Sequence, residues 1–193
     1  MKRLVFAMVA LALVASAQTA ASQPAASRYG GLSGLYTMPF GDFEKVVGDG
    51  WGILLSGEQF VNPNRAIAIT SDLGYLDFGS KTVGTAKADM SMFPVQFGLR
   101  VYPLAAKKPN SKAQLFGEGG LGFFTTRTEI QTGVFSESQY DYYFGTNAGF
   151  GIKLAANPKV SLLVDATWNW VFADGTDPNY IALRGALMIP MGR

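Results

Sequence analysis

The amino-acid sequence predicts an all-β fold, an eight-stranded antiparallel up-and-down transmembrane β-barrel. Three observations lead to this class. Apolar residues alternate with polar residues or glycine over long segments, the segments are joined by connections of alternating length, and charge is scarce. Charged residues make up 16% of the chain, against about 25% in soluble domains. With 193 residues, the chain is long enough for one domain of this kind.

The first residues have the pattern of a secretory signal peptide. Lys2 and Arg3 precede the apolar run LVFAMVALALVA, and Ala-Ser-Ala at 15–17 is a small-residue cleavage site. The apolar run is shorter than the ~20 residues of a membrane-spanning helix. We therefore assign three segments: a cleavable signal peptide at 1–17, a flexible lead-in at 18–28 and the barrel domain at 29–193.

The alternation is clearest in QYDYYFGTNAGFGIKL, residues 139–154, where the even positions are nearly all apolar and the odd positions are polar or glycine. Successive side chains of a strand point to opposite faces, so this pattern indicates one long strand between two environments. Such a strand can cross a bilayer or lie at the edge of a large soluble sandwich. The same test predicts eight strands, at 29–40, 50–61, 65–78, 89–103, 113–126, 139–154, 159–172 and 180–191.

The connections between these strands alternate in length. NPN at 62–64 and AANP at 155–158 are short, and the nine residues at 104–112 fall on the same side. The other connections are longer and polar, and we expect loops at 41–49, 79–88, 127–138 and 173–179. Short turns at one end and long loops at the other are typical of an up-and-down membrane barrel.

The charged residues within the strands fall on the polar face of the alternation. A soluble barrel needs many more charges on its outside, so this face is predicted to line the lumen. The interior of an eight-stranded barrel is only just wide enough for side chains, so these charges must largely satisfy one another. The expected lumen charge network is Glu58, Asp72, Arg100, Glu118, Asp141, Lys153, Asp165 and Arg184.

Two interpretations of this network stay open. It is a structural polar plug, or it is a gated narrow path for ions or small solutes. Arg184 lies on the strand after Asp165 and is a candidate partner for it. In that case, loss of Asp165 would leave a buried base unpaired.

Aromatic residues gather where strands meet long loops. We predict an interfacial girdle that includes Tyr140, Tyr142, Trp168, Trp170 and Phe172. These side chains would not fit an interior a few side chains wide, whereas lipid accepts them. The alternative is a periplasmic soluble β-barrel that binds an apolar ligand in its interior.

At three places the chain resembles the small eight-stranded outer-membrane barrels of the OmpA/OmpX/OmpW type. The segments are MFPVQFGLRVYPL (92–104), AQLFGEGGLGFF (113–124) and NAGFGIKLAANPKVSLLVDATW (147–168). The resemblance implies an outer-membrane location, with membrane lipid and the barrel-assembly machinery as partners. It also implies a structural, surface-interaction or minor-permeability role.

Enzymatic function is not expected. The enzymes among such barrels are known to rely on histidine, and this sequence has no histidine and no cysteine. GEGGLG at 117–122 matches a dinucleotide fingerprint, but it lies inside a predicted strand with no helix after it. ADGTDP at 173–178 is too irregular for a calcium loop. We therefore expect no cofactor and no metal.

Charge gives two further expectations about partners. Without Lys2 and Arg3 the chain keeps 14 basic residues against 14 acidic ones, which gives no basis for a nucleic-acid partner. The long loops are biased toward acid, which leaves room for a surface ligand or cations. Their acidic residues are Asp42, Glu44, Asp49, Glu129, Glu137, Asp174 and Asp177.

Overall fold

The structure is a computed structural model. It describes residues 28–83, 86–105, 107, 111–132, 135–157, 160–173 and 175–191. The expected signal peptide, and the lead-in apart from Arg28, lie outside the described residues.

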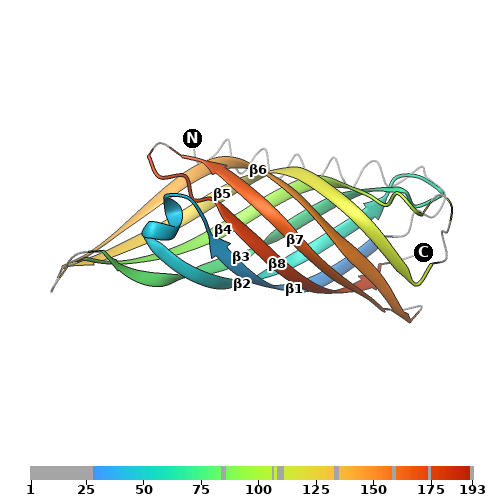
Figure 1. Ribbon diagram of the computed structural model, residues 1–193, viewed down its shortest axis with the longest axis horizontal. Helices are drawn as coiled ribbons and strands as arrows, with labels where there is room; N and C mark the ends of the chain where they lie inside the picture. The colour runs from blue at the N-terminus through green and yellow to red at the C-terminus, as the bar shows by residue number, and fades with distance from the viewer. Residues whose placement is uncertain are drawn as a thin grey trace.

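Eight antiparallel strands close into one barrel in which each strand pairs with its neighbours in sequence and β1 pairs with β8 (Figure 1). The predicted fold class is therefore confirmed. The strands are β1 (Arg28–Pro39), β2 (Val47–Phe60), β3 (Ile67–Val83), β4 (Ala86–Val101), β5 (Ala113–Thr132), β6 (Phe135–Asn157), β7 (Val160–Phe172) and β8 (Tyr180–Pro190).

A single turn of 3-10 helix, η1 (Phe43–Lys45), lies between β1 and β2, where a loop was expected. In the residues that the structure describes, no helix is long and apolar enough to cross a membrane.

Every strand carries large apolar side chains on the outside of the barrel. One from each strand is more than half exposed: Leu32, Leu55, Leu73, Leu99, Leu121, Phe150, Val164 and Leu187. A soluble protein does not expose a continuous apolar surface of this extent. The alternation read from the sequence therefore places its apolar face outward, toward lipid.

The inward face is not uniformly polar, which corrects the expectation of a simply polar lumen. Two buried apolar clusters fill it. The upper cluster, toward the long loops, contains Phe43, Val47, Leu54, Leu76, Phe78, Met92, Phe124, Val171, Tyr180 and Ala182. The lower cluster, toward the short turns, contains Phe60, Ala68, Tyr102, Ala105, Phe116, Leu163, Ala186 and Met188.

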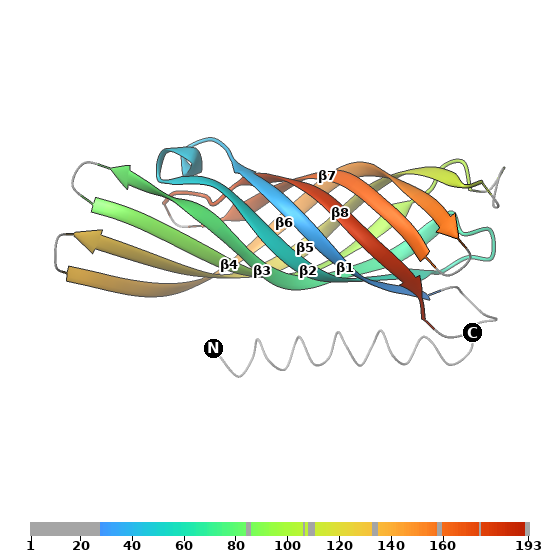
Figure 2. The same ribbon diagram turned by 90° about the horizontal axis from the view of Figure 1, so that it is seen from below.

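The expectation of loops at 79–88 and 127–138 is wrong. β3 and β4 continue until Val83 pairs with Ala86, and β5 and β6 continue until Thr132 pairs with Phe135. Both hairpins reach far beyond the rest of the barrel (Figure 2). Outside lipid both faces of a strand meet water, so apolar alternation is no longer required and the sequence pattern that marked these strands disappears.

β4 and β5 pair along this whole extension, from Ala86↔Thr132 onward. The two hairpins therefore form one four-stranded sheet, which we call the projecting sheet: residues 81–83, 86–91, 125–132 and 135–142. On either side the neighbouring strands stop earlier. β2 pairs with β3 as far as Val47↔Ser80, and β7 pairs with β6 only from Phe144↔Phe172.

A band of outward aromatic side chains marks the level where the closed part of the barrel ends. Ring contacts join Trp51 to Tyr75, Tyr75 to Phe93, Phe123 to Phe144 and Phe144 to Phe172, with centroids 5.0–6.4 Å apart. A lipid band of about 25 Å takes roughly ten residues of a tilted strand. On β6, the ten residues 145–154 would cross such a band. The next residue is Phe144, which lies at the level of these rings.

Candidate functional site

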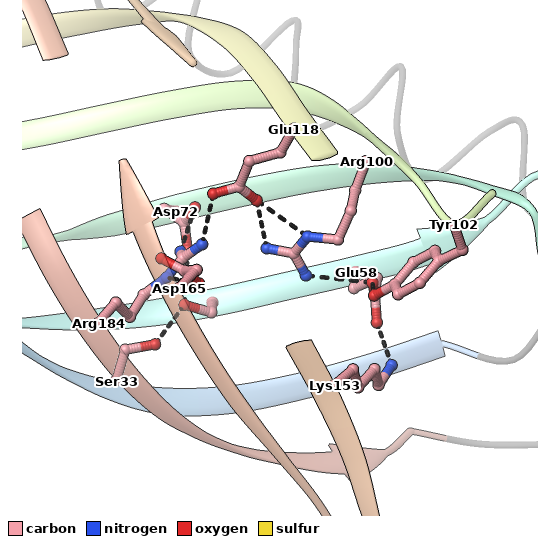
Figure 3. A network of polar contacts seen from close by, with 10 residues as sticks. Ser33, Glu58, Asp72, Arg100, Tyr102, Glu118, Lys153, Asp165 and Arg184 are labelled. Atoms are coloured by element: carbon pink, nitrogen blue, oxygen red, sulfur yellow. Dashed lines mark hydrogen bonds and ion pairs between the residues drawn. The ribbon is translucent and has the colours of Figure 1, made fainter. Parts of the chain in front are cut away.

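Arg184 on β8 is the centre of the luminal charge network (Figure 3). Its three guanidinium nitrogens donate to three carboxylates from three other strands. Nε binds Asp165 at 2.8 Å, Nη1 binds Asp72 at 3.1 Å and Nη2 binds Glu118 at 2.9 Å. The contact with Asp165, considered from the sequence, is present. It is one of three, so Arg184 does not depend on Asp165 alone.

Glu118 links this centre to a second one around Arg100. Arg100 donates to Glu118 from Nε at 2.9 Å and from Nη2 at 2.6 Å, and its Nη1 lies 3.1 Å from Glu58. Lys153 and Tyr102 also donate to Glu58. The Lys153 ammonium lies 3.7 Å from the centroid of the Tyr29 ring. Seven of the eight network residues expected from the sequence therefore lie in one connected set.

Asp141 is the eighth, and the structure does not bring it into this set. It lies on β6 beyond the last residue paired with β7, and its carboxylate accepts a hydrogen bond from Gln139 Nε2 at 3.0 Å. Asp141 has an odd number, like the inward residue Lys153 on the same strand, so the alternation places it on the inward face. This odd–even position, which we call parity, does not say where along the strand the closed barrel ends.

Several uncharged inward residues that form hydrogen bonds in the lumen were not predicted from the sequence. Ser56 donates to Asp72 at 2.6 Å and lies 2.7 Å from Ser33, and Gln96 donates to Asn169 at 2.8 Å. These residues share the inward parity, which was the available signal. Their contacts depend on the stagger between strands, which the sequence does not show.

The network fills the space between the two apolar clusters. Its seven charged side chains are at most 13% exposed. A cavity of about 20 Å³ beside Asp72, Glu118 and Arg184 has room for about one water molecule. The charged side chains are therefore closely packed across this part of the lumen. Within it, four carboxylates meet three cations, and Asp165 Oδ1 has no hydrogen-bond partner among the described residues.

The five aromatic residues singled out from the sequence lie at different levels. Trp170 and Phe172 are exposed at the end of β7, and Phe172 belongs to the aromatic band. Trp168 packs on Phe150 with ring centroids 5.8 Å apart. Tyr140 and Tyr142, 58% and 56% exposed, lie on the projecting sheet beyond the band. That these side chains form the membrane-interface girdle stays a prediction.

The projecting sheet has an open edge on β6. Residues 135–142 pair with β5, and within the described part of the chain no strand pairs with them on their other side. An open edge presents backbone N–H and C=O groups that can pair with another chain. This edge could not be found from the sequence, because residues 135–138 were assigned to a loop and the sequence does not show where pairing with the next strand stops.

The glycine motif GEGGLG has a structural explanation, and no metal-binding group is found among the described residues. GEGGLG lies inside β5, where a side chain on Gly120 would collide with the Phe97 carbonyl oxygen. Small residues at this point allow β4 and β5 to approach closely. In the part of the chain that the structure describes, no group of three or more acidic residues is placed to hold a metal ion.

The chain matches a known protein family over most of its length. The family model described as outer membrane protein beta-barrel domain matches residues 7–184. No curated protein has a significantly similar sequence.

Three solved structures share the fold at low sequence identity. A major outer membrane protein from Thermus thermophilus has a TM-score of 0.63 at 10% identity, covering 86% of this chain and 100% of that one. Neisserial surface protein A has a TM-score of 0.58 at 12% identity, with 85% and 97% covered. OprG from Pseudomonas aeruginosa has a TM-score of 0.58 at 14% identity, with 87% and 95% covered.

Proposed function

The chain belongs to the outer membrane protein β-barrel domain family and lies in the outer membrane. From this premise we propose that it is a surface-interaction protein, which binds a macromolecule outside the cell through the projecting sheet. The observation that carries the proposal is the extension of β3–β6 past the end of the closed barrel, with an open strand edge on β6.

A permeability role is less well supported by the interior. A solute would have to pass the upper cluster, the charge network and the lower cluster in turn. The network offers a cavity of about 20 Å³, while its ion pairs join strands on several sides of the barrel. Opening a path would break buried ion pairs at a cost of several kcal/mol.

The projecting sheet supports the proposal because the barrel does not need it to span a bilayer. The closed part already has the length that a bilayer takes, and long loops of such barrels face the outside of the cell. Strands that continue beyond this level expose ordered backbone and side chains to the medium. Surface loops and extensions held by a rigid scaffold are common places for binding.

The test compares the intact protein with a shortened form, both in lipid nanodiscs. Thr128 and Gln139 are register partners, so residues 129–138 can be replaced by Asn-Gly, which closes a two-residue hairpin. Binding is measured to immobilised soluble proteins that span a range of isoelectric points, and to neutral and sulfated polysaccharides. We expect the intact form to bind at least one member of this panel and the shortened form to lose that binding.

Planar-bilayer recording is the second arm of the test. We expect no steady conductance from either form. A steady single-channel conductance in the intact form would favour the permeability role instead. Binding that survives the shortening, or absence of binding to every member of the panel, would contradict the surface-interaction role.

A further inference from the structure

We propose that the open edge of β6 binds an extended peptide segment of a partner protein in which lysine or arginine recurs at every second position. This inference rests on the proposed function and names the partner's chemistry. The edge, residues 135–142, lies beyond the aromatic band and is therefore outside the hydrocarbon layer. An extended segment can add to such an edge as a further strand through backbone hydrogen bonds.

The charges on the edge determine which segment fits. Glu137 and Asp141 have the same parity, so both point to the face that continues into the lumen. Across the sheet on β5, Ile130 is opposite Glu137 and Thr126 is opposite Asp141, so neither carboxylate has a cation beside it there. Within the described residues neither forms an ion pair. A strand added at the edge with cations at every second position would place them opposite these two acids.

A second copy of this chain is a poor occupant. In an antiparallel pair, directly opposite residues point to the same face. Backbone hydrogen bonding at the open edge therefore places odd-numbered residues of one copy opposite odd-numbered residues of the other. Pairing centred on Gln139 would set Glu137 of each copy against Asp141 of the other, and like charges directly opposite are destabilising. The two acids thus disfavour this register of self-pairing, whereas a basic strand would place cations opposite both of them.

The opposite face of the edge carries Tyr140 and Tyr142, which are 58% and 56% exposed. An added strand with lysine on one face would place its other side chains next to these rings. β-Branched or aromatic residues pack well there. The partner segment is therefore alternating, with basic residues at every second position and β-branched or aromatic residues between them.

The test uses the peptide acetyl-TKTKTKT-amide and its counterpart with glutamate in place of lysine. The full chain is held in nanodiscs of neutral lipid, so that the membrane does not attract the peptide. We expect the lysine peptide to bind at least about tenfold more tightly than the glutamate peptide. A Glu137→Lys/Asp141→Lys double variant should reverse this preference. Preference unchanged by the double variant would overturn the proposal.

Backbone pairing is tested with two N-methylated isomers of the lysine peptide. One is methylated on the three lysine amides and the other on three threonine amides. Each pattern removes the hydrogen-bond donors of one edge of the extended peptide. We expect one isomer to bind like the parent and the other about tenfold or more weakly. Equal binding of both isomers would show attraction by charge alone and would overturn edge pairing.

The outcome is distinguishable from that of the proposed function. If the shortened hairpin abolishes panel binding but the lysine peptide does not bind, the projecting sheet binds by another surface and only this inference fails. If the shortened form keeps panel binding, the proposed function fails whatever the peptide does.

Discussion

The closed barrel and the projecting sheet share strands β3 to β6 but differ in the side-chain pattern and the strand pairing that they need. Within the closed part, β5 and β6 place Leu121 and Phe150 toward lipid and Glu118 and Lys153 toward the lumen. Beyond the aromatic band the same two strands carry polar residues on both faces, with Ile130, Tyr140 and Tyr142 exposed among them. There β6 also loses its second neighbour.

This difference follows from the surroundings of each part, lipid for the closed barrel and water for the projecting sheet. Lipid cannot satisfy backbone polar groups, so strands that cross it must close into a barrel. Water can satisfy them, so a strand edge is tolerated outside. The same kind of substitution should therefore have a large effect in one part and a small effect in the other.

The largest difference is expected for the loss of an arginine. Arg184→Met leaves three buried carboxylates without the cation that they share, at a cost of about 3–5 kcal/mol of unfolding free energy. The matched variant is Arg127→Met on the projecting sheet, where the pair with Glu129 is 3.5 Å long and largely exposed. We expect it to change the unfolding free energy by less than about 1 kcal/mol. Urea unfolding in liposomes, followed by tryptophan fluorescence, measures both.

The next difference concerns arginine placed on an exposed apolar position. Leu162 is 41% exposed on β7 and Ile130 is 49% exposed on β5, so exposure alone would predict similar results. Leu162→Arg places a charge against lipid and should cost about 2–4 kcal/mol near the midplane. Ile130→Arg lies in water on the projecting sheet and should stay within about 0.5 kcal/mol. Equal costs would mean that the surroundings of the two positions have been assigned wrongly.

A smaller effect is expected for the buried carboxylate Asp165. Asp165→Asn leaves three carboxylates against three cations, and Arg184 keeps Asp72 and Glu118. The cost should be about 1 kcal/mol, close to that of a single hydrogen bond and well below that of Arg184→Met. Asp141→Asn on the projecting sheet should be neutral. A cost for Asp165→Asn as large as that for Arg184→Met would contradict the excess of acid in the network.

Only a small effect should come from the largest change in the chain. Replacement of residues 129–138 by Asn-Gly removes part of the projecting sheet and leaves the pairing of the closed part intact. The unfolding free energy should change by less than about 1 kcal/mol, because the replaced residues lie outside the closed part of the barrel. Unboiled and boiled samples should still migrate differently in SDS gels. Loss of that difference would show that the closed barrel depends on the extension.

The number of strands, their order and the side of each that faces lipid could all be predicted from the sequence. These features follow from the alternation of apolar and polar residues along each strand and from the residues of the turns. Both signals lie within short stretches of sequence. The sequence also placed Glu58, Asp72, Arg100, Glu118, Lys153, Asp165 and Arg184 on the inward face, because their parity is opposite to that of the apolar residues. The local signal weakened wherever lipid no longer required alternation, and the ends of β3 to β6 were taken for loops.

Which inward residues meet depends on the tertiary structure. Arg184 binds Asp72, which is 112 positions away in the sequence, because closure of the barrel and the stagger of its strands bring β3 and β8 within reach across the lumen. Asp141 lies outside the network, since β7 ends at Phe172 and β6 continues past Phe144 paired only with β5. Parity assigns a side chain to a face, but its height along the barrel depends on pairing with distant strands, and height decides whether a carboxylate is part of the plug or of the open edge.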